Sequence, residues 1–509
     1  MENEYSLASV RIRLRYSTLV NASVAAYRIG VAILFMIILA RKLTISEFGV
    51  WGVIFASAQT LTVPVNLWSW WAQRYYARGH VYSLATGLAL TGVYWLISVI
   101  IYVGLSYIEA SILNVSLYYF MIAVPLLPLL TARAYLRSLL SVVKPEAIGY
   151  SNFIYETIRL ILVYILLVEM RWGLIGAIFT LEVSTLVTVI YMVFALVRID
   201  KASRLRVDRG LLGEWLKGFY IPLLNVVASS MRSGVRPFIS WYYRDEAPVS
   251  YLNTGLASSN PITGVTQSLV PALYARLLRG TRDSRDVEES LRLYMLFTGF
   301  MLVTLVLLSR PIASLYSLRY VDAYPIIAIM ALYASLISLA NIFIQVVQGV
   351  DRIDVYGIRS PSILLKSLLF KGSLVRVASI ALSYLGIILL SYTLGDANPL
   401  ESAINVSISL LLGAIVFLVL SLSLAGHTVK YMFPFKTLMQ VAVASIITGL
   451  YYRILGVHEY IVYKFWEDAP ILIAYIILGG VVYVSSLYPL SGWFRGLLKA
   501  IINNLLHKK

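Results

Sequence analysis

Cysteine is absent from this 509-residue sequence, and histidine occurs only four times. The chain therefore forms no disulfide and offers no thiolate ligand to a metal. The histidines lie in or beside predicted loops or near the C-terminus, at positions 80, 427, 458 and 507, so we expect no metal site. Nucleotide-binding glycine-rich loops, zinc motifs and nucleophile elbows are also missing. We expect neither a cofactor nor an enzyme.

Charge is scarce as well, because 13% of the residues are charged whereas 60% are hydrophobic. A soluble protein of this composition would expose too much apolar surface to water. The apolar residues form long uninterrupted blocks, and about 20 such residues in a helix cross the ~30 Å hydrocarbon layer. Strands of a membrane barrel would alternate polar and apolar residues, and these blocks do not. The sequence predicts an all-α, polytopic integral membrane protein.

About 14 of these blocks have the length of a transmembrane helix. Their apolar residues run on without the alternation of strands, and polar or charged segments separate them. We expect the helices at 17–40, 48–70, 83–107, 115–138, 149–168, 172–197, 215–240, 247–270, 291–309, 324–348, 373–394, 402–425, 436–455 and 470–489.

Lysine and arginine outnumber the acidic residues by 42 to 25, which gives a net charge of +17. If the N-terminus is inside, most of the basic residues fall in cytoplasmic loops, as the positive-inside rule requires. The surplus charge thus indicates topology and contact with anionic lipid head groups, and not nucleic-acid binding. We expect a multi-pass protein of the cytoplasmic membrane with both termini in the cytoplasm. The segment 198–214 is then a cytoplasmic linker, and 490–509 is a basic amphipathic tail.

The predicted helices 17–40 and 215–240 share a pattern of residues. Because six helices return the chain to the same side, this similarity predicts parallel repeats about an axis along the membrane normal. We expect two six-helix lobes, 1–197 and 215–425, followed by two accessory helices within 426–489. The matching residues are Asn21, Arg28, Gly30 and Val31 in the first helix and Asn225, Arg232, Gly234 and Val235 in the seventh.

Polar and charged side chains inside the predicted spans are the candidate binding residues, since an arginine at the bilayer centre costs at least about 2.5–3.5 kcal/mol. Asn21 and Arg28 are seven positions apart and share one helix face. Asn225, Arg232 and Arg236 form a similar stripe in the seventh helix. Arginine has a planar, permanently charged fork that matches phosphate oxygens, so the stripes predict a cavity for phosphate or pyrophosphate. The alternative is that these arginines pair with internal acids.

Two acidic residues, Glu156 and Glu182, lie inside the predicted spans. Glu156 and Arg159 are one turn apart, which favours a structural ion pair. Glu182 has no local cation. It either pairs with Arg28 or titrates in ion coupling, and the sequence does not separate these two roles.

The predicted helix 247–270 is the most polar of the spans, with several asparagine, serine and threonine residues. Asn260–Pro261 near its middle predicts a kink or a break, as in transporter helices that line a cavity. The alternative is close helix–helix contact through small residues.

Several motifs follow the predicted helices in register along most of the chain. Leu39–Trp51 reads Leu-Ala-Arg-Lys-Leu-Thr-Ile-Ser-Glu-Phe-Gly-Val-Trp, at the junction of the first two helices. The other motifs are Ser268–Tyr274, Arg310–Tyr316, Tyr320–Tyr324 and Gln348–Gly349. Together they resemble polysaccharide flippases of the Wzx type, within the multidrug/oligosaccharidyl-lipid/polysaccharide exporter superfamily.

This resemblance implies twelve core helices in two lobes, two accessory helices and rocker-type alternating access. It also implies a cationic cavity for the diphosphate-sugar head group of a lipid-linked oligosaccharide, and glycan-assembly proteins as possible partners. Arg28 and Arg232 match the cavity arginines that such flippases carry in the first helix of each lobe. Drug exporters of the superfamily usually have an acidic residue in the first helix, where this chain has Arg28.

Two other functions compete with a lipid-linked oligosaccharide flippase. A cation-coupled small-molecule or drug exporter of the same superfamily would depend on Glu156 or Glu182 and not on the arginines. A membrane glycosyltransferase or oligosaccharide ligase would need acidic catalytic residues on sizeable outside loops, and the predicted outside loops are short.

Overall fold

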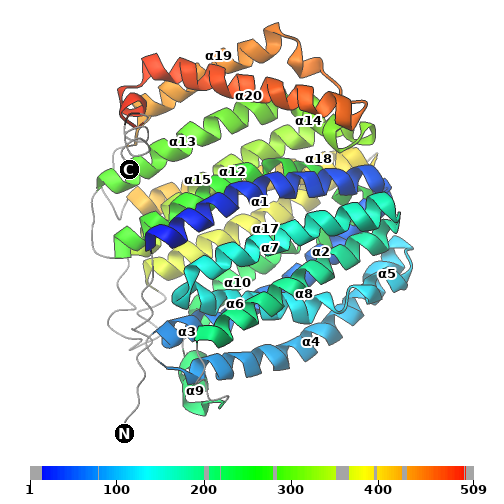
Figure 1. Ribbon diagram of the computed structural model, residues 1–509, viewed down its shortest axis with the longest axis vertical. Helices are drawn as coiled ribbons and strands as arrows, with labels where there is room; N and C mark the ends of the chain where they lie inside the picture. The colour runs from blue at the N-terminus through cyan, green and yellow to red at the C-terminus, as the bar shows by residue number, and fades with distance from the viewer. Residues whose placement is uncertain are drawn as a thin grey trace. The chain divides into compact units, whose positions relative to one another are not determined.

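The structure is a computed structural model that describes residues 14–77, 80–199, 206–217, 219–278, 284–350, 366–394, 398–426, 433–497 and 499. Every secondary-structure element in these ranges is helical (Figure 1). Eleven helices in the described ranges are long and apolar enough to cross a membrane. The prediction of a polytopic all-α membrane protein is confirmed.

The chain divides into two compact units. The first comprises Met1–Asn253 and Ile353–Asn405, and the second comprises Thr254–Arg352 and Val406–Lys509. Helices that begin in the first unit are α1 (Leu14–Lys42), α2 (Ile45–Thr62), η2 (Val63–Val65), α3 (Asn66–Ala77), α4 (Tyr82–Leu113), α5 (Leu117–Ile122), α6 (Leu126–Val143), α7 (Pro145–Val163), η3 (Tyr164–Glu169), α8 (Gly173–Ile199), α9 (Arg209–Lys217), α10 (Tyr220–Ser233), α11 (Val235–Tyr243), α12 (Ala247–Leu278), α17 (Leu368–Leu394) and α18 (Pro399–Gly426). The second unit adds α13 (Ser284–Leu307), α14 (Ser309–Tyr316), η4 (Leu318–Ala323), α15 (Tyr324–Val350), α19 (Phe435–Ile454), η6 (Val457–Glu459) and α20 (Phe465–Leu490).

The eleven apolar helices correspond to eleven of the predicted spans, and the other three predictions fall on α1, α10–α11 and α12. Each of these elements carries polar or charged residues inside its predicted span, among them Arg28, Arg232 and Asn253. Helices with such residues are stable in a membrane when they face a protein interior or a water-filled cavity. These helices are therefore ones to search for a site.

The seventh predicted helix, 215–240, is not one helix in the structure. Residues 209–217 form the separate helix α9, and the span itself is divided at Gly234 into α10 and α11. Pro237 explains the division, since its ring clashes with the carbonyl four residues earlier and it has no N–H to donate. The Tyr384 hydroxyl donates to the Met231 carbonyl at 2.6 Å, next to the break.

The eighth predicted helix is continuous, so of the kink or break expected at Asn260–Pro261 the break does not occur. α12 runs without interruption from Ala247 to Leu278. A proline removes only one backbone hydrogen bond, and neighbouring side chains and helices accommodate such a residue in membrane helices. The corresponding proline of the second helix, Pro64, does end an α-helix, because the 3₁₀ turn η2 separates α2 from α3 there.

Two helix pairs in the first unit correspond to each other under the predicted repeat. α1 packs against α7, the first helix against the fifth, and α10 packs against α17, the seventh against the eleventh. A parallel repeat would place these pairs in equivalent positions. The two-lobe division and its boundaries stay a prediction.

A buried aromatic core holds α3, α4, α6 and α9 together in the first unit. The Tyr135 hydroxyl donates to the Ser83 and Leu84 carbonyls at 3.1 and 2.9 Å, and a side chain at Gly87 would collide with its ring. Trp215 of α9 is buried in the same core. The predicted linker 198–214 thus leads into a short helix that is anchored on this unit, and its residues 200–205 lie outside the described ranges.

Candidate functional site

The first basic cluster of the site lies between α1, α6 and α7. The Arg133 guanidinium of α6 stacks over the Tyr155 ring of α7 at 3.9 Å. Arg159 of α7 lies 4.3 Å from the Phe35 ring of α1 and 5.2 Å from the same Tyr155 ring. Two guanidinium groups therefore share one tyrosine, an arrangement that fixes the planes of both cations.

Arg28 and Arg137 belong to the same cluster. Arg137 is within electrostatic range of Arg133 and Arg28, and Glu156 is within range of Arg159, Arg28 and Arg133. Glu156 forms an ion pair with Arg159, the partner that the one-turn spacing predicts. Glu156 thus lies within range of three of the four arginines. These five side chains carry a net charge of about +3 at neutral pH. Such a group attracts an anion.

The second basic cluster joins α10 and α17. Arg376 Nη1 donates to the Asn225 amide oxygen at 3.4 Å, and Ser373 Oγ donates to the same oxygen at 3.2 Å. Arg232 is within electrostatic range of Arg376. The predicted ligand Asn225 therefore positions Arg376. Arg232 itself has an exposed side chain within a predicted span. Exposure of such a cation to lipid is costly.

The other predicted site residues have different surroundings. Arg236 lies on α11, two residues beyond the break at Gly234, and no ion pair joins it to another described residue. Asn21 lies on α1, but its side chain is outside the described part of the chain. Glu182 of α8 does not pair with Arg28. Its Oε1 atom is buried and has no hydrogen-bond partner among the described residues.

Glu182 instead belongs to a buried acidic group that the sequence analysis did not anticipate. Ser57 of α2 donates to Glu109 of α4 at 2.9 Å, and the Glu109 Oε2 atom has no partner in the described structure. The Tyr102 hydroxyl is fully buried within electrostatic range of both carboxyl groups. Because α4 continues to Leu113, Glu109 is part of a membrane helix and not of the loop predicted after residue 107.

Sequence reasoning also missed three arginines of the two clusters. Arg133 and Arg137 lie within the span Leu117–Ser141, and Arg376 lies within Leu368–Leu394. All three lie towards the predicted cytoplasmic ends of their helices. Under the positive-inside rule, basic residues at these ends are interpreted as signals of topology. Their position inside the apolar stretch was the available signal. Glu109 could be recognised as a membrane residue only from the structure, which shows that α4 extends to Leu113.

The predicted outer ends of the two halves are in contact within the first unit. A Cβ atom at Gly49 of α2 would lie 2.2 Å from the Glu246 carbonyl oxygen, and one at Gly52 would lie 2.3 Å from the Asn253 amide nitrogen. The Ser46 hydroxyl donates to the Glu246 carboxylate. Farther along α2, Thr60 donates to Ser233 of α10 at 2.9 Å. These contacts join the second helix to the helices of residues 220–253.

No protein-family model and no curated protein sequence matches the chain. Solved structures match its fold. A lipid II flippase MurJ in an inward closed conformation aligns with a TM-score of 0.68 at 13% identity, covering 94% of this chain and all of that one. Inward-facing and outward-facing multidrug resistance MATE family transporters of the MOP superfamily align with TM-scores of 0.57 and 0.55 at 13% and 14% identity. They cover 81% and 84% of this chain, and 98% and 100% of their own lengths. The chain therefore has the fold of the exporter superfamily that its motifs resemble.

Proposed function

We propose that this protein moves a lipid-linked oligosaccharide, carried on polyprenyl phosphate or pyrophosphate, across the cytoplasmic membrane by alternating access. The transported glycan would serve cell-surface polysaccharide synthesis or protein glycosylation, alongside glycan-assembly proteins. The excess of guanidinium over carboxylate groups in the two clusters carries the proposal. The cluster residues are Arg28, Arg133, Arg137, Arg159, Arg232 and Arg376, with Glu156 as the acidic member, and Arg236 of α11 is a further proposed cation of the site.

The two clusters have the chemistry to bind a pyrophosphate. Guanidinium groups donate paired hydrogen bonds to phosphate oxygens, and a low-dielectric site weakens the screening of their charge. A buried cation without a counterion is costly, so a ligand that brings negative charge stabilises the site. The polyprenyl chain would stay in the lipid, where its apolar surface is already out of water.

The contacts of α2 provide the moving part of this mechanism. Gly49 and Gly52 permit close approach to residues 246–253, and this approach closes the predicted outer end. Release of a bulky head group to the outside requires that α2 separates from these residues. The hydrogen bond from Ser46 to Glu246 would then break. A ligand selects between the two states only through its different affinity for each.

A cation-coupled exporter of small molecules is the second candidate function, and the acidic group around Glu109 and Glu182 favours it. Two buried carboxyl groups with unpartnered oxygen atoms would bind a proton or a cation. An exporter of organic cations would need such acids in its substrate path. The basic clusters would repel its substrate, which is why we prefer the anionic lipid.

Thermal unfolding of the protein in nanodiscs tests the proposed function. A polyprenyl-pyrophosphate-linked oligosaccharide should raise the unfolding temperature, because a ligand at 100 times its Kd stabilises the folded state by about 2.7 kcal/mol. Free polyprenol and tetraphenylphosphonium should give no shift. Arg28→Ala and Arg232→Ala should abolish the shift and the flipping of the lipid, whereas Arg319→Ala, at an exposed residue of η4, should keep both. Stabilisation by the organic cation without any by the glycolipid would establish the exporter instead.

A further inference from the structure

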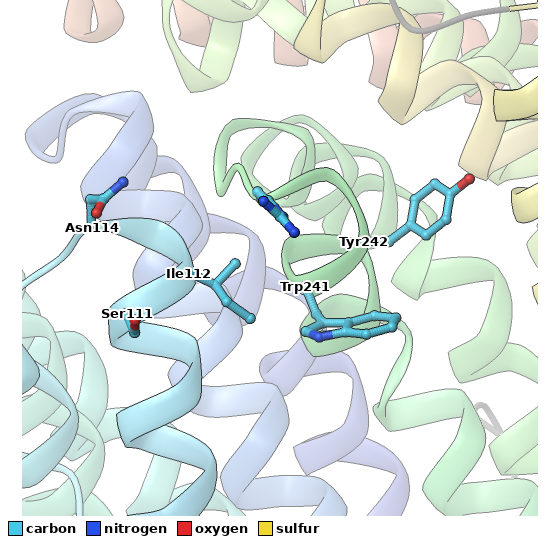
Figure 2. A pocket seen from close by; sticks show the side chains of 6 residues that line it. Ser111, Ile112, Asn114, Trp241 and Tyr242 are labelled. Carbon is cyan, nitrogen blue, oxygen red and sulfur yellow. The ribbon is translucent and has the colours of Figure 1, made fainter.

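A pocket of about 560 Å³ lies where the C-terminal ends of α4 and α11 meet (Figure 2). Both ends fall in segments that the charge distribution places outside the membrane. The volume is within the range of about 300–1,000 Å³ that is usual for small-molecule sites. The lining residues are Ser111, Ile112, Asn114, Trp241, Tyr242 and Arg244.

One wall of the pocket is an aromatic platform on α11. Trp241 is 55% exposed, so its ring is open to a ligand. Phe238 lies behind the platform, with ring centroids 6.0 Å from Trp241 and 5.9 Å from Tyr242. Tyr242 also contacts Tyr243, whose hydroxyl is hydrogen-bonded to Ser391 of α17. The platform is therefore held in place before any ligand binds, which lowers the entropic cost of binding.

The rest of the lining carries hydrogen-bonding groups, from the end of α4 and from the residue that follows α11. Asn114 and Arg244 end their helices in the left-handed conformation, with φ of 52° and 53°. The Arg244 side chain is exposed and makes no hydrogen bond or ion pair with the described residues. Ser111 and the Asn114 amide add donors and acceptors beside it.

The backbone at this pocket favours a hydroxylated ligand over a phosphate. Two helix C-termini meet here, and their last carbonyl groups are acceptors with partial negative charge. Hydroxyl groups donate to such carbonyls, whereas a phosphate would be repelled by them. An aromatic face, several hydrogen-bonding groups and a single cation together match a sugar ring.

We propose that this pocket binds a pyranose sugar. The apolar C–H face of the ring lies against Trp241, and the hydroxyl groups bond to Asn114, Ser111 and Arg244. This inference rests on the proposed function, since the sugar belongs to the glycan of the transported lipid. Because α4 and α11 come from different predicted lobes, a bound sugar bridges them and holds the predicted outer end closed.

Saturation-transfer NMR on the purified protein in nanodiscs tests the pocket with free methyl pyranosides of glucose, galactose, mannose, N-acetylglucosamine and glucuronic acid. At least one should bind, and Trp241→Ala should reduce the transfer signal at least about tenfold, a loss of about 1.4 kcal/mol. Arg244→Ala should weaken binding, whereas Trp241→Phe, which keeps an aromatic face, should retain part of it. Trp466→Ala is the matched control, because Trp466 is also exposed, at 82%, on the predicted outer side.

Two results would overturn the sugar pocket: no pyranoside binds, or binding persists unchanged in Trp241→Ala. Trp241 would then be an ordinary aromatic of the membrane interface. Thermal stabilisation by sugar-free polyprenyl pyrophosphate separates this failure from failure of the proposed function. If the pyrophosphate stabilises the protein but no pyranoside binds, only the sugar-pocket proposal is rejected. If a pyranoside binds but the pyrophosphate does not stabilise the protein, the proposed pyrophosphate site is rejected and the sugar pocket is retained.

Discussion

Single arginines acquire their chemistry here from the side chains around them. Arg159 is neutralised by Glu156 and stacked on Phe35, so it serves the structure of the α1–α7 contact. Arg137, by contrast, has an exposed side chain inside a membrane span and lies near other arginines. The same residue type thus supports the fold at one position and is available to a ligand at the other.

Replacement of Arg137 tests this distinction. A charge-assisted hydrogen bond to a phosphate contributes about 1.5–3 kcal/mol, so Arg137→Ala should lower the rate of lipid flipping about 10- to 100-fold. Arg137→Lys should restore part of the rate, since it keeps the charge without the planar fork. A lipid-flipping assay in proteoliposomes measures the rates of both variants. An unchanged rate in Arg137→Ala, with normal folding, would place the phosphate elsewhere.

The buried residues Glu156 and Glu182 should respond in opposite ways to loss of charge. Glu156→Gln leaves Arg159 as a buried cation without its partner, which should destabilise the fold by about 3 kcal/mol. Glu182→Gln removes a buried carboxylate whose Oε1 atom has no partner in the described structure, and it should be neutral or stabilising. Thermal denaturation compares the variants. Equal destabilisation by both would mean that Glu182 has a counterion.

At the scale of helices, the motif Leu39–Trp51 has a structural explanation. Thr44 and Glu47 form a capping box that begins α2, which satisfies two backbone N–H groups. Ser46 and Gly49 contact Glu246. The residues that resemble flippases therefore start a helix and provide its contact at the predicted outer end.

Gly49→Ala should open this contact. The added methyl group would meet a backbone oxygen at 2.2 Å, and a clash of this kind costs about 1–3 kcal/mol. Val53, four residues further along α2, is fully buried. A cysteine introduced at this position reports whether the contact has opened. We expect labelling of Val53→Cys by an impermeant maleimide from outside to become at least about tenfold faster.

Gly104→Ala is the control for this experiment, because nothing lies within 4 Å of a Cβ at that position of α4. Alanine also has the higher helix propensity, so both substitutions favour their own helices by about 0.5–1 kcal/mol. Labelling that is equally slow in both variants would show that α2 does not gate the outer end.

At the scale of the whole molecule, the orientation in the membrane follows from charge. The chain has no cysteine, so single cysteines report their side without background. An impermeant maleimide added to intact cells should label Asp396→Cys and Glu467→Cys. It should not label cysteines at Arg204 and Lys508 until the membrane is permeabilised. Labelling of position 204 in intact cells would invert the predicted topology.

Much of the fold was predictable because the formation of each membrane helix depends mainly on the residues of that helix. Each helix must satisfy its own backbone hydrogen bonds in lipid, so its length and apolar composition appear directly in the sequence. The continuity of α12 at Asn260–Pro261 depends on neighbouring helices, whereas the division of the seventh helix was missed for a different reason. The division itself has a local cause in Pro237, which hydropathy does not register.

The sequence predicted the basic chemistry of the candidate site, but not all of the residues that form it. By itself the sequence determined an excess of arginine, a membrane location and the ion pair of Glu156 with Arg159, because these follow from composition and from one helical turn. Only the tertiary structure decided that Glu182 lies with Glu109 and Tyr102 and not with Arg28. It also brought Arg133 beside Arg159, and Ser111 beside Trp241. The physical reason is that the rotation of each helix about its axis is set by side-chain packing against other helices, which lie far away in the sequence.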